Sequence, residues 1–287
     1  MTNGPARQDR ADPAVDPGGF LAGLGRLGDG EPWPIAEAAL ALASLEERGA
    51  PIRAALERLR ALQAATAGRV RPDMTPQDAA AALSQALIED GGITGDDENY
   101  DDLKNANLIR VMERGRGLPV SLGILGMACG RAAGWTMAGL AFPGHFLVQL
   151  GCGGGRTVID LFHGGVTLDA EALRAMLKAA QGAAAELKPR HYAAVSDREV
   201  LLRLQNNIKL RLVQKGDLSG AADVVERMLL IAPARPALHR EAGLLNAHAG
   251  RLSRAIAALE AYIRLETLDG PRRDAQAMID KLRGQLN

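Results

Sequence analysis

The stretch that decides the fold covers residues 99–165 and reads NYDDLKNANLIRVMERGRGLPVSLGILGMACGRAAGWTMAGLAFPGHFLVQLGCGGGRTVIDLFHGG. Residues 115–119 are predicted to form a turn, and a helix is predicted to open just after Pro119. Residues 120–133 form this helix and are nearly all apolar, and Gly134 ends it. A helix that is apolar on every face is buried, so we expect it to be the central helix of its domain.

Apolar runs that follow this helix predict three strands, at residues 135–142, 146–150 and 157–162. The last two are joined by the glycine-rich residues 151–155 and are expected to pair antiparallel. His145 begins one apolar run, and Asp160 comes near the end of the next. On neighbouring strands these side chains can form an Asp–His hydrogen bond, which fixes the imidazole tautomer and supports a protonated ring.

Ser121 lies in the first turn of the predicted helix. Helix start, strand and strand is a chain order that can present a nucleophile, its base and an orienting acid. A first-turn serine more often satisfies free backbone N–H groups, and as a nucleophile it needs more help from its base than a cysteine does. Two interpretations stay open: a non-catalytic Ser121, or a Ser121–His145–Asp160 triad for acyl transfer or amide hydrolysis.

Four motifs of this stretch resemble the bacterial SirB-type family, in which a transglutaminase-like domain is fused to tetratricopeptide repeats. They are Asn99-Tyr100, ERGRGLPVSL, FPGHFLVQL and VIDLFHGG. The resemblance extends over residues 35–265. It implies an α+β fold: a helix-rich, papain-like domain with a small antiparallel sheet, followed by all-α helix pairs.

The resemblance also implies roles for the site residues. His145 takes the position of the base and Asp160 that of the orienting acid. In transglutaminases the nucleophile is a cysteine at the helix start; here that position falls on Ser121, or on Pro119 if the helix is aligned without a gap. Because neither residue is a cysteine, the sequence favours a degenerate, non-catalytic site.

Residues before the site predict a helical subdomain that packs against the domain core. Apolar periodicity and prolines at helix starts indicate three helices, at residues 34–47, 51–66 and 76–89. Thr75 is expected to cap the third. Two more helices are predicted at residues 105–114 and 168–180. We assign residues 18–190 to this first domain, and residues 1–17, rich in Pro, Asp and Arg, to a disordered tail.

The C-terminal part of the chain repeats with a period of 34 residues. Matching pairs are Gly216 and Gly250, Ala221 and Ala255, Val225 and Leu259, and Met228 and Tyr262. This is the period of a tetratricopeptide helix pair. The predicted units are residues 202–235 and 236–269, with a capping helix at 271–286. We assign residues 198–287 to this repeat domain.

Composition excludes some partners. The 34 basic and 34 acidic residues give zero formal net charge, so no overall field attracts nucleic acid or an anionic membrane. The N-terminus has no apolar signal region, and no run of about 18 apolar residues occurs. We therefore expect a soluble, cytoplasmic protein that binds neither nucleic acid nor membrane.

Other polar residues give weaker signals. Cys129 is interpreted as a small core residue and Cys152 as an exposed, inert thiol. Asn99, Tyr100 and Asn105 either line the cleft rim or cap the next helix. The remaining histidines, His163, His191, His239 and His248, lack metal-like spacing, so neither a metal nor a cofactor is expected. The favoured function is therefore an interaction protein that binds a protein or peptide in the tetratricopeptide groove.

Overall fold

A computed structural model describes residues 11–47 and 49–285. Most of the tail expected at residues 1–17 lies outside the described residues; residues 13–15 form a turn, and Pro17 opens the first helix. The described chain forms two compact units. We call residues 12–17 and 28–204 the α+β unit, and residues 18–27 and 205–285 the helical unit.

Six α-helices lie in the α+β unit: α2 (Ile35–Glu46), α3 (Ile52–Ala67), α4 (Pro76–Ser84), α5 (Leu108–Arg114), α6 (Pro119–Ala132) and α7 (Ala170–Gln181). Their starts follow local chemistry. Thr75 and Asp78 form a capping box at α4, and Asn107 accepts two backbone N–H bonds at α5. A π-helical turn, η1 (Gln85–Glu89), extends α4, and 3₁₀ turns lie at η2 (Leu103–Asn105) and η3 (Pro189–Tyr192).

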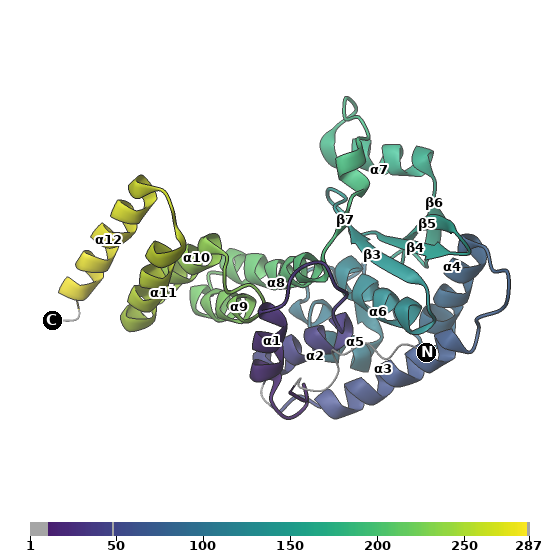
Figure 1. The fold of residues 1–287 in the computed structure, drawn as a ribbon, viewed down its shortest axis with the longest axis horizontal. Coiled ribbons are helices and arrows are strands. Elements are labelled where there is room, and N and C mark those ends of the chain that lie inside the picture. Colours follow the sequence, from purple (N-terminus) through teal and green to yellow (C-terminus); the bar gives the residue numbers. More distant parts are fainter. Residues whose placement is uncertain (1–10, 48, 286–287) are drawn as a thin grey trace. The chain divides into compact units, whose positions relative to one another are not determined.

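A five-stranded antiparallel sheet, ordered β6-β5-β4-β3-β7, carries the site (Figure 1). Its strands are β3 (Thr136–Leu140), β4 (Val148–Cys152), β5 (Gly155–Asp160), β6 (Val166–Leu168) and β7 (Ala194–Val195). The hairpin expected between the second and third predicted strands is present, with Val148 opposite Ile159. A separate parallel pair joins β1 (Thr94–Gly95) to β2 (Arg116–Gly117).

Helix α6 packs against one face of this sheet, and every residue from Pro119 to Gly130 is buried. The close approach depends on glycines that share one face of the helix. A side chain at Gly123 would overlap the ring of Phe146, and one at Gly126 would overlap Leu161. The absence of a side chain at Gly123 and Gly126 therefore allows α6 and the sheet to pack closely.

The other face of the sheet is covered by α7, which follows the short strand β6. A cluster of buried side chains joins them: Leu140, Phe142, Leu147, Leu173 and Leu177. Only one face of α7 is buried, as expected for a helix that covers a sheet from the solvent side.

The helical unit contains most of α8 (Asp197–Gln214), then α9 (Leu218–Ile231), α10 (Pro236–His248), α11 (Leu252–Leu265) and α12 (Asp269–Gly284). The 34-residue period reappears in the structure, since α9 and α11 start 34 residues apart and end 34 residues apart. Gly216 and Gly250 both adopt the left-handed conformation, with φ of 77° and 74°, after α8 and α10. The repeat residues Ala221, Ala255, Met228 and Tyr262 are all buried.

Helix α1 (Pro17–Gly25) belongs to the helical unit, a grouping that the sequence did not indicate. It buries Phe20, Leu21 and Leu24, and a side chain at Gly25 would overlap the carbonyl oxygen of Leu230. The division between the units falls within α8, after residue 204, whereas the sequence placed its two domains at 18–190 and 198–287.

The helix-rich α+β class is confirmed. Within the described ranges, no helix has both the length and the apolar character needed to cross a bilayer.

Candidate functional site

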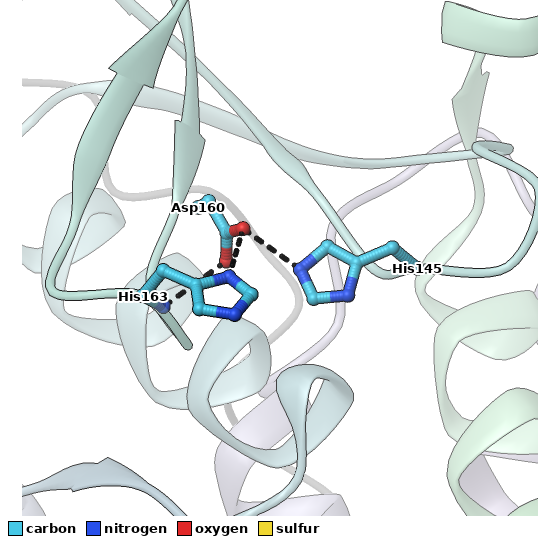
Figure 2. A group of neighbouring side chains, drawn as sticks. All are labelled: His145, Asp160 and His163. Carbon is cyan, nitrogen blue, oxygen red and sulfur yellow. Dashed lines mark hydrogen bonds and ion pairs between the residues drawn. The ribbon is translucent and has the colours of Figure 1, made fainter. Parts of the chain in front are cut away.

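His145 and Asp160, which the sequence predicted to pair, lie side by side at one edge of the sheet. The His145 Nε2 and Asp160 Oδ2 atoms are 2.9 Å apart, and Figure 2 shows the carboxylate facing the ring. Asp160 is the last residue of β5, and His145 lies in the loop that precedes β4. The bond occupies Nε2, so Nδ1 is the ring nitrogen left to face a nucleophile.

The chain after β5 fixes the orientation of the Asp160 carboxylate. Its Oδ1 accepts hydrogen bonds from the backbone N–H groups of Phe162 (3.0 Å) and His163 (3.3 Å). This turn of the Asx type is closed by Gly164 and Gly165, whose φ angles of 79° and 75° favour glycine. Oδ2 is thereby left facing the two histidine rings.

The loop that carries His145 is held by an arginine that the sequence did not single out. Arg203, on α8, donates to the carbonyl oxygens of His145 (2.6 Å) and Phe142 (3.3 Å), and its guanidinium lies over the ring of Phe146. Burial lowers the pKa of Arg203 from its ordinary value. Gly144 in the same loop adopts a left-handed conformation, with φ of 75°.

A second histidine completes the group. His163 Nδ1 lies 2.7 Å from the same Oδ2 atom, and its ring stacks on that of His145 with centroids 5.4 Å apart. This role was not predicted from the sequence, since His163 showed no spacing to carboxylates or cysteines that is typical of a metal site. The informative signal was the short spacing from Asp160 to His163, which a turn after the strand folds into one contact.

The two histidines also set the charge state of Asp160, which is 2% exposed. Burial alone would raise the pKa of this carboxyl, but the hydrogen bonds from His145 and His163 outweigh burial and hold the pKa below its ordinary value. Asp160 is therefore an ionised acceptor at neutral pH.

Ser121 is not brought into this group. It is fully buried in the first turn of α6, and its Oγ donates to the carbonyl oxygen of Asn105 at 2.7 Å. Among the residues that the structure describes, no hydrogen bond joins Ser121 to His145. Pro119, the other residue aligned with the nucleophile position, offers no nucleophilic atom.

The three residues considered for the cleft rim differ in their surroundings. Tyr100 is 41% exposed, and its ring meets the edge of Phe162, which in turn contacts His145. Asn99 is exposed, and its backbone N–H donates to Asp96. Asn105 is fully buried, with its Nδ2 donating to the carbonyl oxygen of Asn99, so it braces the loop and is not at a rim.

A cavity of about 610 Å³ lies between the sheet and α7, away from the histidines. Gln149, Arg156, Arg174 and Tyr192 are among its lining residues, and none of His145, Asp160 and His163 is. The site therefore joins two histidines and one buried carboxylate, and among the described residues no serine or cysteine is hydrogen-bonded to them.

Comparison with family models agrees with the architecture. Residues 53–206 match a family described as the transglutaminase-like superfamily, and residues 208–283 match a tetratricopeptide repeat. The predicted order, a transglutaminase-like domain followed by tetratricopeptide helices, is confirmed.

Relatives with similar sequences are UPF0162 proteins. One from Xylella fastidiosa is 33% identical over 189 residues, 64% of this chain and 67% of the relative. One from Vibrio cholerae is 30% identical over 165 residues, 57% of this chain and 61% of the relative. Among solved structures, a crystal structure of menin that reveals the binding site for the Mixed Lineage Leukemia protein aligns at 10% identity. It has a TM-score of 0.40, covering 86% of this chain and 69% of that one, a likeness too low to carry an inference.

Proposed function

We propose that this chain, which belongs to the transglutaminase-like superfamily, is a non-catalytic binding protein that holds a protein or peptide partner on its tetratricopeptide helices. The same proposal includes a cytoplasmic location and membership of the SirB-type group of bacterial proteins, which the four sequence motifs suggest.

The buried hydrogen bond of Ser121 is the observation that carries the non-catalytic part. A serine nucleophile needs its hydroxyl in contact with a base. The Ser121 hydroxyl instead donates to the carbonyl oxygen of Asn105, and no thiol takes its place at the start of α6. This arrangement supports a superfamily member that kept its His145–Asp160 pair and lost its nucleophile.

The binding part is supported by an opening in the helical unit. A cavity of about 330 Å³ lies between α10, α11 and α12. Leu244, Leu259 and Met278 give it an apolar wall, and Arg240 and Asp274 place opposite charges at it. An apolar groove flanked by a few charged groups suits a peptide segment with apolar anchors and charged neighbours.

One observation favours a second candidate, a hydrolase or acyltransferase that uses Ser121, His145 and Asp160. The His145–Asp160 bond has the geometry of a base held by its orienting acid. This candidate requires Ser121 to leave Asn105 and reach His145 during a reaction cycle.

Peptide selection tests the binding proposal. A displayed peptide library is panned on the full-length protein, and enriched peptides are titrated against two variants with the same charge change. Arg240→Glu alters the cavity, whereas Arg273→Glu alters an exposed residue of α12 that does not line it. We expect Arg240→Glu to weaken binding by at least about tenfold, roughly 1.4 kcal/mol, and Arg273→Glu to leave it unchanged.

Two outcomes would contradict the proposal. One is a selection in which no peptide is enriched over a bead control. The other is a set of peptides for which Arg240→Glu and Arg273→Glu have equal effects.

A further inference from the structure

We propose that His145, Asp160 and His163 form a binding site for a divalent transition-metal ion. One donor atom from each residue lies within 4.8 Å of the other two, and Figure 2 shows both rings directed at one carboxylate. The site goes beyond the proposed binding of a peptide, because its three ligands lie in the α+β unit and the groove lies between α10, α11 and α12.

The carboxylate is already oriented as a metal ligand. Oδ1 of Asp160 is occupied by two backbone N–H groups, which hold the plane of the carboxylate. Oδ2 is left to contact the histidine nitrogens, and Asp160 would coordinate the ion through this single oxygen. Outer hydrogen bonds of this kind fix the first ligands of protein metal sites.

The ligand atoms lie slightly too close together to surround an ion, and a small movement of the two rings would make room for one. The two nitrogens lie 2.9 and 2.7 Å from Oδ2. Ligands at about 2.0–2.1 Å from a tetrahedral Zn²⁺ are about 3.3 Å apart, so the rings need to withdraw by a few tenths of an ångström. The His163 side chain, 57% exposed, is free to make that shift on its solvent side.

The donor set selects the class of ion. Two imidazole nitrogens and one carboxylate oxygen suit Zn²⁺ and neighbouring first-row ions, whereas Ca²⁺ and Mg²⁺ require mainly oxygen ligands. Three protein ligands also leave a coordination position open, as in zinc sites that accept water or a further ligand. The exposed side of His163 gives that position access to solvent.

Each histidine can carry its proton on its other ring nitrogen and still serve as a ligand. In the structure both rings direct a nitrogen at Oδ2, where each donates a hydrogen bond to the ionised carboxylate. A bound ion needs the same nitrogens without protons. A neutral histidine meets this need by carrying its proton on the other ring nitrogen, Nδ1 in His145 and Nε2 in His163.

Isothermal titration of the chelator-stripped, full-length protein with ZnCl₂ tests the site. We expect one equivalent to bind to the parent protein. His163→Ala should weaken binding by at least about 100-fold, because loss of a ligand exceeds the 10- to 100-fold cost of losing an outer hydrogen bond. His248→Ala, which removes an exposed histidine of α10, should leave the affinity unchanged.

Two further measurements separate this site from thiol binding and from misfolding. Cys152→Ser should bind Zn²⁺ as the parent does, and a Co²⁺ complex should show visible d–d bands without a sulfur-to-cobalt charge-transfer band. Circular dichroism should show that His163→Ala keeps the fold, as an exposed side chain allows. Absence of Zn²⁺ binding by the parent, or binding that His163→Ala leaves intact, would overturn the proposal.

Discussion

Replacing Asp160 with alanine is expected to lower the free energy of unfolding by about 2–4 kcal/mol. The side chain accepts hydrogen bonds from two backbone N–H groups and two histidine rings, and it is 2% exposed. Removing it leaves several donors without a partner, and each unpaired buried group costs about 1–3 kcal/mol. Only part of this cost applies at His163, which reaches solvent.

Urea unfolding in the presence of EDTA measures this effect without a contribution from metal. Asp169→Ala is a matched control, since Asp169 also accepts two backbone N–H groups, at the start of α7, but is exposed. Its loss should cost about 1 kcal/mol, the usual value for a helix cap. Equal destabilisation by the two substitutions would show that the buried histidine contacts add nothing.

Iodoacetamide at pH 8 is expected to label Cys129 at least about 1,000-fold more slowly in the native protein than in urea. Cys129 is fully buried in α6, and burial raises the pKa of its thiol to about 12. Because only the thiolate reacts, a rise from the ordinary value near 9 reduces the reactive fraction by about three orders of magnitude.

Peptide mapping by mass spectrometry follows the two cysteines separately. Cys152 ends β4, is partly exposed, and donates a weak hydrogen bond to the carbonyl oxygen of Met74 at 3.4 Å, so it should react first. Native labelling of Cys129 within tenfold of its rate in urea would contradict this picture and would reopen a role for a thiol in α6.

Much of the fold followed from periodicity in the sequence. The 34-residue repeat predicted the positions of Ala221, Ala255, Met228 and Tyr262 in the core, because a repeated helix pair buries the same positions each time. The apolar segment 120–133 predicted the buried helix α6 for a similar reason: no face of it is polar enough for solvent.

Elements with little local signal were not predicted. The short strands β6 and β7 have three and two residues, and pairing with longer neighbours defines them rather than their own composition. Helix α1 is rich in glycine, and no local pattern reveals its grouping with the C-terminal helices, where Gly25 closely approaches the carbonyl oxygen of Leu230.

In the candidate site, too, some features were predicted from the sequence and others were not. The pairing of His145 with Asp160 was predicted mainly from the family resemblance, together with their positions on neighbouring predicted strands, and the two lie 2.9 Å apart. For Asn105 the sequence left a rim position and a helix cap open, and the structure buries this residue, whose carbonyl oxygen accepts the hydroxyl of Ser121. His163 was missed because its contact with Asp160 depends on the turn after β5, in which the backbone N–H groups of Phe162 and His163 donate to Asp160 Oδ1.

The proposal of a binding protein without catalysis is tested most directly by a fluorophosphonate, which reacts covalently with activated serine nucleophiles. Native protein is incubated with a molar excess of the reagent beside a serine hydrolase as a positive control, and intact mass is recorded. Because the Ser121 hydroxyl is buried and bonded to Asn105, we predict no adduct on Ser121 while the control enzyme is fully labelled. A stoichiometric adduct on Ser121 that disappears in His145→Ala would contradict the proposal and identify a serine-dependent enzyme.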